Sequence, residues 1–430
     1  MRNILIASLI ASAFLSLDAQ ATDLLQTYKD ALANDPVYAS ARAALSAGQE
    51  AMPQARAGLL PNIGVSGDYS RNEVENAGSF NSSSYTLALT QPLFRWANWQ
   101  QYEQSKLSVA ASEAQFAQAQ QDLIVRMGQA YFDVLTAQDV LTFVQAQKIA
   151  ISEQLASAKR NFEVGTSTIT DTNEAQSRYD LAVAQEFAAE NDLEIKRTTL
   201  EQIVGKPTTS LASLRPGLTL NLPEPAQIEP WVSSAEQQNY GVIGQQLALE
   251  IAKRDISKSR AGHLPTLDLV ASRNHSNQPT TFSANNVTTN TNSIGVQWSI
   301  PLFSGFAVTS KVRQSIALED KARNDLESVR RSAIQSARQS YLGVSSGLSQ
   351  VKALEAAEIS SQSSLDSNKL GYQVGVRINI DVLNAQQQLY STRQALAKAR
   401  YDTIMNGLRL KSAAGTLKEQ DVVQVNTLLQ

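Results

Sequence analysis

The sequence predicts a mainly α-helical chain that also contributes four β-strands to a membrane barrel shared by several copies. Two long, proline-poor stretches repeat their apolar residues every seven positions, which is typical of coiled-coil helices. Four shorter stretches alternate apolar and polar residues, which is typical of strands with one apolar face. The order of helix, strand hairpin, long helix and returning helix occurs twice, which indicates a tandem duplication.

The first 21 residues have the features of a secretory signal peptide. Arg2 precedes an apolar run from Ile4 to Leu17, and the small residues Ala19 and Ala21 follow it, so we expect cleavage after Ala21. No later stretch reaches the roughly 18 consecutive apolar residues of a membrane-spanning helix. The chain has no cysteine, so we expect neither disulfides nor a lipid anchor on a thiol.

The composition argues against several classes of function. The formal net charge is −3, whereas nucleic-acid-binding proteins carry a strongly basic footprint, so we expect no nucleic acid as a partner. The two histidines have no ligand cluster or catalytic partner at a recognisable spacing. We therefore expect no enzyme, no metal site and no cofactor.

The chain after the signal peptide begins with helices and continues with strands. Residues 22–61 have a helical pattern, which we expect to be kinked at Pro53. From Ile63 the period changes to two, and this predicts a first membrane β-hairpin over 62–94. A polar loop from Asn72 to Ser83 is expected to join its two strands.

Residues 95–204 are predicted to form the first long helical hairpin. From Trp96 to Phe162 the sequence has no proline and almost no glycine, so about 65 residues can form one helix about 100 Å long. Its apolar positions repeat in sevens: Phe116, Leu123, Ala130, Ala137, Val144 and Ile151. Gly165 is expected to end this helix, and Asp171 to begin the returning one.

Five prolines between residues 205 and 231 predict a linker, after which the order repeats. The second half contains a helix over 232–264, a membrane β-hairpin over 265–303 with a polar loop from Asn274 to Thr291, a long helical hairpin over 304–417, and a C-terminal segment over 418–430. Short blocks recur directly: Arg260-Ala261-Gly262 repeats Arg56-Ala57-Gly58, and Pro301-Leu302-Phe303 repeats Pro92-Leu93-Phe94.

The four strands require partners, because four strands cannot close a barrel and lipid does not tolerate an open sheet edge. Strands of about 9 to 11 residues cross a bilayer when they are tilted. Two chains would give eight strands and three would give twelve, and the small polar residues on one strand face favour a wet lumen. We expect the polar loops outside the cell and the helices in the periplasm.

Several ordered blocks carry a resemblance to a known family that covers essentially all of the chain after residue 21. They are Gly262-His263-Leu264-Pro265-Thr266-Leu267-Asp268-Leu269, Ser363-Ser364-Leu365-Asp366, Val374-Gly375 with Asp381-Val382-Leu383, Leu396-Ala397-Lys398-Ala399-Arg400-Tyr401, and Lys411-Ser412-Ala413-Ala414-Gly415-Thr416-Leu417. With these blocks the chain resembles the TolC family of outer-membrane channel proteins.

The resemblance implies a homotrimer with a 12-strand barrel in the outer membrane and a 12-helix hollow cylinder in the periplasm. It implies an exit duct, gated at the periplasmic end, for drug efflux pumps and type I protein secretion. The implied partners are outer-membrane lipid, a periplasmic adaptor protein and an inner-membrane transporter of the RND, ABC or MFS class. The rival hypothesis is a trimeric coiled-coil spacer or tether of the outer membrane, without passage of solutes.

Asp381 is a candidate for the constriction of the gate. From spacing alone it is either part of a ring of carboxylates, which would select cations, or an acid that caps a helix N-terminus. The resemblance implies the ring and adds the position of Asn384. The family pattern has an aspartate there, so this chain departs from it and would carry fewer carboxylates at the constriction.

Four polar residues are candidates for a latch between the two hairpin tips. Tyr372 and Arg377 on one tip could bond to Thr170 and Asp171 on the other, although exposed polar residues of this kind can also be plain surface groups. The resemblance implies that these links keep the entrance shut. It also implies that the tip glycines Gly165 and Gly375, which end helices in either case, contact the adaptor.

Overall fold

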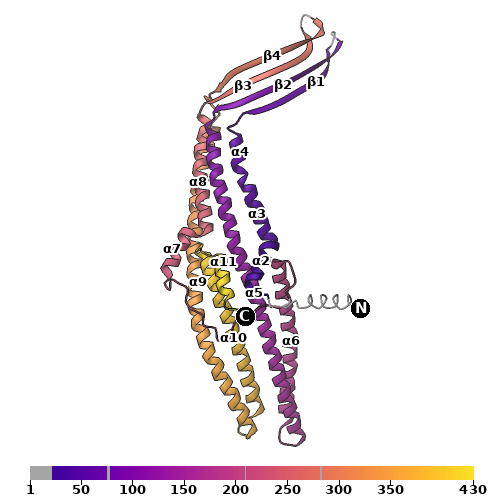
Figure 1. The fold of residues 1–430 in the computed structure, drawn as a ribbon, viewed down its shortest axis with the longest axis vertical. Coiled ribbons are helices and arrows are strands. Elements are labelled where there is room, and N and C mark those ends of the chain that lie inside the picture. The colour runs from indigo at the N-terminus through magenta and orange to yellow at the C-terminus, as the bar shows by residue number, and fades with distance from the viewer. Residues whose placement is uncertain (1–21, 75–77, 209, 281–282) are drawn as a thin grey trace, which may run out of the picture. The chain divides into compact units, whose positions relative to one another are not determined.

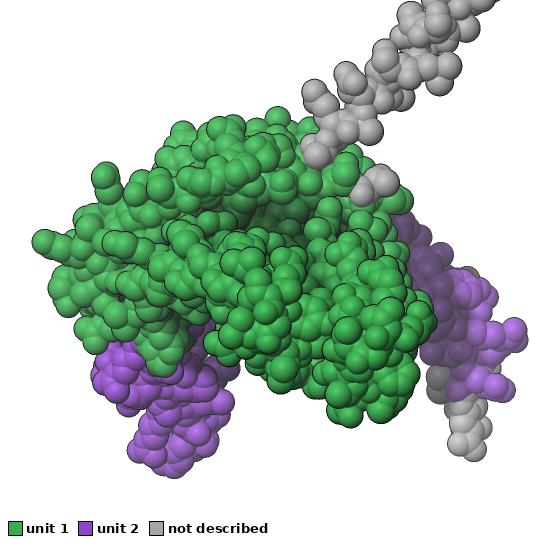
Figure 2. Space-filling model, turned by 90° about the horizontal axis from the view of Figure 1, so that it is seen from below, with its two compact units in different colours: residues 1–40, 118–239, 332–430 green, residues 41–117, 240–331 purple. Residues whose placement is uncertain are grey.

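The computed structural model describes residues 22–74, 78–208, 210–280 and 283–430, and the expected signal peptide lies outside them. The chain forms two compact units, each assembled from separate stretches (Figure 2). Unit 1 contains residues 1–40, 118–239 and 332–430; unit 2 contains residues 41–117 and 240–331. Among the residues that the structure describes, no helix combines the length and apolar character that crossing a membrane requires.

Unit 2 contains a four-stranded antiparallel sheet with the strand order β1-β2-β3-β4 (Figure 1). The strands are β1 (Asn62–Val74), β2 (Gly78–Phe94), β3 (Thr266–Thr280) and β4 (Ser283–Ser299). The two sequence-predicted hairpins therefore lie side by side through β2 and β3. Arg95, just after β2, donates to Asp268 on β3 at 2.6 Å, and this ion pair ties the hairpins together.

The strands extend further than the sequence predicted. The expected polar loops over 72–83 and 274–291 are mostly strand, with Arg71 paired to Asn81 and Ser276 paired to Thr289. The polar residues in these segments leave the backbone free to form ladder hydrogen bonds, so polarity alone did not mark a loop. The expectation of 9 to 11 residues per strand was therefore wrong for the whole strands, which have 13 to 17.

Shorter helices precede each of the two strand hairpins. Helix α3 (Pro36–Gln49) is followed by α4 (Ala51–Ala57), so the helix breaks at Glu50 and not at Pro53 itself. Proline has no N–H to donate to the residue four positions earlier, which places the break ahead of it. Helix α8 (Tyr240–Arg260) and the short 3-10 helix η1 (Ala261–His263) precede β3.

Two pairs of long helices form the predicted hairpins. They are α5 (Trp96–Glu163) with α6 (Ile169–Val204), and α9 (Ala307–Gln373) with α10 (Asn379–Ala413). The seven-residue pattern marks positions that are buried in unit 1: Leu123, Ala130, Ala137, Val144 and Ile151 in α5, and Ala333, Ala337, Val344, Val351 and Leu365 in α9.

Shorter helices and the linker also belong to unit 1: α2 (Leu24–Asn34), α7 (Ile228–Gln238) and α11 (Glu419–Asn426). Helix α7 begins inside the proline-rich segment, because Pro230 lies in its first turn, where a missing N–H costs nothing. Tyr131 of α5 donates its hydroxyl to the Ala212 carbonyl oxygen, and the duplicated Tyr341 of α9 donates to that of Ala226, both at 2.8 Å. The duplication thus extends to how each long helix holds the linker.

Candidate functional site

The first candidate tip is the turn between α5 and α6. Gly165 has a φ of +76°, the left-handed conformation that ends a helix and that other residues adopt at a cost. The Asp171 carboxylate accepts hydrogen bonds from the Thr168 backbone N–H at 3.0 Å, the Thr168 hydroxyl at 2.8 Å and the Ser167 hydroxyl at 2.9 Å. Burial raises the pKa of Asp171, but these hydrogen bonds outweigh it and hold the pKa below its usual value.

The second tip, between α9 and α10, has the same backbone but a weaker cap. Gly375 also has a φ of +76°. The Asp381 carboxylate receives only a 3.5 Å contact from the Ile378 N–H and lies 3.7 Å from the Arg377 guanidinium. The side chains of Arg377 and Asp381 are 61% and 33% exposed, so Asp381 lies in the first turn of α10 and also reaches solvent.

Three polar links join the two helical hairpins near their tips. Asn161 of α5 donates to the Tyr372 hydroxyl of α9 at 3.0 Å, and Gln154 of α5 donates to Asn379 of α10. The third link is made by Arg178 of α6, which donates to two residues of α10. Its acceptors are the side-chain oxygens of Gln387 at 2.6 Å and Asn384 at 2.9 Å.

An apolar contact accompanies these links. Leu383 of α10 is 2% exposed and lies in a cluster with residues of the other hairpin: Ile151, Leu155 and Ala158 of α5, and Ala175 and Ala182 of α6. Leu383 is next to Asn384, so the α10 residue that inserts into the first hairpin and the residue that Arg178 binds are consecutive. The hairpins are therefore held together at this point by both packing and hydrogen bonds.

The candidate latch residues make other contacts within this chain than the ones expected. Asp171 is bound to its own turn, Arg377 pairs with Asp381, and Tyr372 bonds to Asn161. Thr170 is exposed, and its side chain has no hydrogen bond to another residue that the structure describes. Asn384, expected at the constriction as a departure from the family pattern, is an acceptor for Arg178.

The heptad spacing of Arg178 from Asp171 could have marked it as a candidate, although its residue type alone did not. Arg178 follows Asp171 by one heptad, so the two residues lie on the same side of α6. Asn161 and Gln154 of α5 are likewise one heptad apart. The residues predicted from the sequence lie at the tips. Arg178, Asn161 and Gln154 were not among them, because they lie one or more helical turns away from the tips.

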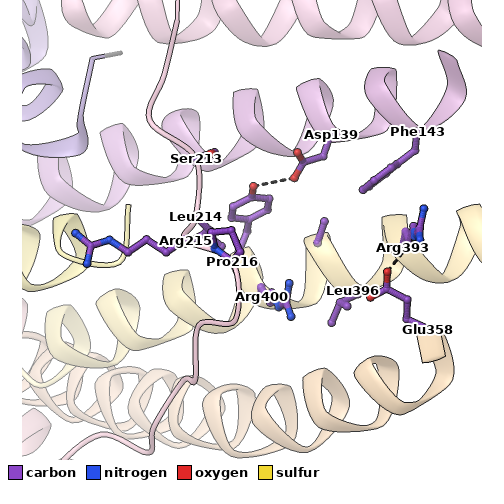
Figure 3. A pocket seen from close by; sticks show the side chains of 12 residues that line it. Asp139, Phe143, Ser213, Leu214, Arg215, Pro216, Glu358, Arg393, Leu396 and Arg400 are labelled. Atoms are coloured by element: carbon purple, nitrogen blue, oxygen red, sulfur yellow. Dashed lines mark hydrogen bonds and ion pairs between the residues drawn. The ribbon is translucent and has the colours of Figure 1, made fainter. Parts of the chain in front are cut away.

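A pocket of about 420 Å³ lies further along the long helices of unit 1, between α5, α9, α10 and the linker (Figure 3). On one side the Tyr401 hydroxyl donates to Asp139 at 2.8 Å. On the other, Arg393 donates to Glu358 at 2.9 Å. Burial raises the pKa of Asp139, and the hydrogen bond from Tyr401 offsets only part of that effect.

The described part of the chain contains no group of three or more histidine, cysteine, aspartate or glutamate side chains that could hold a metal ion. Near the tips, Arg377 is paired with Asp381 and Arg178 with two amide side chains, while Asp171 accepts from its own turn. Their arrangement can hold two hairpins together reversibly, because each contact is a hydrogen bond or ion pair at a partly exposed position.

Comparisons with known proteins agree with this architecture. The family model described as "Outer membrane efflux protein" matches residues 27–206 and 231–416. The chain is 35% identical to the outer membrane protein TolC of Escherichia coli K12, over 99% of this chain and 88% of that one. It is 32% identical to the proteases secretion protein PrtF of Dickeya chrysanthemi, over 96% and 92% of the two chains.

Solved structures show the same fold. The Campylobacter jejuni CmeC outer membrane channel matches with a TM-score of 0.80 at 17% identity, over 97% of this chain and 94% of that one. The outer membrane protein VceC of Vibrio cholerae matches with a TM-score of 0.78 at 18% identity, over 91% and 96%. The chain belongs to the outer membrane efflux protein family and is an outer-membrane protein.

Proposed function

We propose that this chain forms the exit channel of drug efflux pumps and of type I protein secretion. The family and the secretion relatives support this role. The channel makes and breaks no covalent bond, so it is not an enzyme and takes no cofactor. The energy for transport comes from its partner in the inner membrane.

The observation that carries the proposal is a sheet with an apolar face and two open edges. Strand β1 pairs only with β2, and β4 only with β3, among the described strands. In lipid such edges are closed by further strands. A homotrimer would close them into a 12-strand barrel wide enough for a lumen, and it would bring six helical hairpins together as a hollow cylinder of 12 helices in the periplasm.

The tips would then form the periplasmic mouth of the channel. Asp381 and Asn384 form its constriction, with Asp381 as the charged ring. Arg178 places a cation beside Asn384, so the charge of the constriction is partly balanced. This arrangement predicts a weaker preference for cations than a channel with aspartate at both positions would have.

Thr170, Asp171, Tyr372 and Arg377 are proposed as a latch that acts between hairpins of the assembled channel. The Arg377 guanidinium is 3.7 Å from Asp381 at an exposed position, and exposed ion pairs of this kind are weak. Arg377 can therefore exchange this partner for a carboxylate of another hairpin at little cost.

The exposed apolar residues at the tips are proposed to contact a periplasmic adaptor protein. Val164, Val374 and Val376 flank Gly165 and Gly375, and Val376 is 77% exposed. Apolar side chains that project from an otherwise polar tip are typical of a contact surface. The adaptor would connect the channel to an inner-membrane transporter of the RND, ABC or MFS class.

The test is conductance of the purified full-length protein in a planar lipid bilayer. The proposal expects discrete single-channel steps, and a deletion strain that is more drug-sensitive than its parent and regains resistance with the intact gene. A protein that gives no steps, together with a deletion strain of unchanged sensitivity, would instead identify a spacer or tether.

The latch has a separate test in the same apparatus. The double variant Arg377→Ser, Tyr372→Phe removes the proposed links from the second tip, and we expect higher conductance than the parent shows. Equal conductance of variant and parent would remove the latch role and leave the channel function standing.

A further inference from the structure

One face of the sheet is apolar and exposed. On β4, Ile294, Val296 and Trp298 lie on this face, and Ile294 is 78% exposed. The strand register places Leu87 and Leu89 of β2 on the same face, and the alternate positions carry small or polar residues. In an outer-membrane protein, such a face is the one that contacts lipid.

Arg273 on β3 belongs to this apolar face. It continues the alternating series Leu267, Leu269 and Ala271, and the register pairs it with Leu87 on β2 and with Asn292 on β4. Arg273 is exposed. A lipid-facing arginine is costly unless an anion pairs with it, so its presence in this series calls for a partner.

No residue of the protein can supply that partner from an adjacent strand. Strand β3 lies between β2 and β4 of the same chain, so the neighbours of Arg273 on both sides are described (Figure 1). The diagonal neighbours on the same face are Leu89, Tyr85, Ile294 and Asn290. None of these is acidic, and Arg273 forms no ion pair with any residue that the structure describes. A second copy would add strands beyond β1 or β4, at least two strands away.

His275 is the next residue of β3 on this face and has a fixed ring. The ring stacks on Tyr85 with centroids 4.6 Å apart and planes 22° apart. Its Nδ1 lies 2.7 Å from the Asn290 side-chain oxygen, which can only accept, so Nδ1 donates. In the neutral ring the other nitrogen, Nε2, then carries no proton and is available as an acceptor for a ligand. Arg273 thus offers hydrogen-bond donors, and His275 an acceptor, side by side above an apolar surface.

The position of these residues along the strand identifies the leaflet. At about 3.3 Å per residue, Arg273 lies about 20 Å along β3 from Leu267, which is about 15 Å along the membrane normal for a strand tilted by about 40°. An apolar band is about 25 Å tall, so Arg273 lies in its outer half, and its long side chain can reach the outer headgroups. His275 lies further in the same direction.

We propose that Arg273 and His275 form a binding site for a phosphate of an outer-leaflet glycolipid, that is, of lipopolysaccharide. The guanidinium binds the phosphate through two N–H donors, whose spacing matches that of two phosphate oxygens. Nε2 of His275 accepts a hydrogen bond from a hydroxyl of the phosphorylated sugar. Leu87, Leu89 and Ile294 contact the acyl chains below. The site depends on the outer-membrane location of the protein and not on whether the channel conducts.

The experiment measures how much lipopolysaccharide the purified full-length protein retains in detergent. We expect Arg273→Gln to retain about tenfold less than the parent, because a charge-assisted phosphate contact is lost. Arg273→Lys should retain an intermediate amount, because it keeps the charge and loses the two-donor geometry. The matched control is Arg260→Gln at the end of α8, which removes the same charge outside the apolar face and should retain as much as the parent.

Two further ligands test which chemical groups of lipopolysaccharide the site binds. Lipopolysaccharide from which the phosphates have been removed should bind to the parent as weakly as intact lipopolysaccharide binds to Arg273→Gln. Vesicles of phosphatidylglycerol, which carry a phosphate without the phosphorylated sugar, should compete poorly. Equal retention by parent and Arg273→Gln, equal binding of the dephosphorylated glycolipid, or full competition by phosphatidylglycerol would each overturn the assignment. Arg273→Gln removes a charge from a lipid-facing position, so it is expected to fold, and the thermal melt of the detergent-solubilised protein verifies this.

Discussion

Arg178 on α6 donates a hydrogen bond to Asn384 on α10, with 2.9 Å between the guanidinium nitrogen and the amide oxygen. The same guanidinium binds Gln387 at 2.6 Å, so one side chain ties two helical hairpins together close to their tips. Asn384, where the resemblance implies a departure from the family pattern, is therefore the acceptor of an inter-hairpin bond.

Removal of this bond should make the proposed channel easier to open. Arg178→Gln loses charge-assisted hydrogen bonds, which at an exposed position contribute about 1 kcal/mol. We expect a roughly fivefold higher ratio of open to closed channel in single-channel recordings. The matched control is Arg393→Gln, which breaks a bond between α9 and α10 of the same hairpin and should leave the ratio unchanged. Equal ratios for parent and Arg178→Gln would exclude a role for this bond in gating.

Replacement of Asn384 by aspartate should change both the open fraction of the channel and its preference for cations. Asn384→Asp places a carboxylate against Arg178, which strengthens the inter-hairpin bond and should lower the open fraction. Each open channel should then prefer cations more strongly, since every chain adds a carboxylate at the constriction. The reversal potential in a salt gradient measures this preference. Asn221→Asp, which adds the same charge in the linker, is the control; a shift of equal size there would show that the effect is not local to the constriction.

The two tips should differ in their response to loss of the capping acid. Asp171→Ala removes three hydrogen bonds and should destabilise the first turn of α6 by about 1 kcal/mol, which hydrogen exchange of residues 168–171 would report. Asp381→Ala removes a 3.5 Å contact and a weak, exposed ion pair with Arg377, and should change exchange at the second tip less. Similar increases at both tips would contradict this difference.

The first tip should also loosen in acid. The pKa of Asp171 is lowered in the folded chain, so the stabilisation it gives is present above the usual aspartate pKa of about 3.9 and is lost as the pH falls through the folded value. Hydrogen exchange at this tip, corrected for its intrinsic pH dependence, should therefore accelerate in acid in the parent and not in Asp171→Ala.

Asp139 should produce the opposite dependence on pH. Its pKa is raised by burial, so its contribution to stability is complete below about pH 3.9 and is lost as the pH rises through the raised folded value. Asp139→Asn keeps an acceptor for Tyr401 without the charge, so it should melt at a higher temperature than the parent at pH 7 and at a similar temperature at pH 4. If the melting temperatures of Asp139→Asn and the parent differ by the same amount at both pH values, the charge of Asp139 is not the cause of the difference. Tyr401→Phe, which leaves the carboxylate without its donor, should melt below the parent at pH 7.

The sequence predicted the helices well because their pattern is long and regular. The heptad positions from Leu123 to Ile151 are buried, and both tip glycines have the left-handed φ that a helix end requires. The polar partners at the tips were not predictable in the same way. A heptad shows which side of a helix faces its neighbour, but not which residue of that neighbour lies opposite, and Arg178 and Asn384 are brought together by the alignment of two separate hairpins.

The ends of the strands escaped prediction for a different reason. Segments such as 276–278 carry polar side chains on both faces, so the alternation that marks a half-buried strand disappears while the backbone ladder continues. Arg273 shows the same limit within the apolar band. Only the register of β3 with both neighbouring strands shows which face it shares and that no acidic residue lies beside it.

The open edges of the sheet also have a genetic consequence. Among the described strands, β1 and β4 each have one edge without a partner, so a barrel that several copies closed would be incomplete wherever one copy carried a defective edge strand. One mutant gene copy that encodes a β1 or β4 unable to pair would prevent barrel closure in mixed assemblies that also contain intact chains. Damage to these two strands would therefore be inherited as dominant, whereas a substitution that merely unfolds the chain before assembly would be recessive.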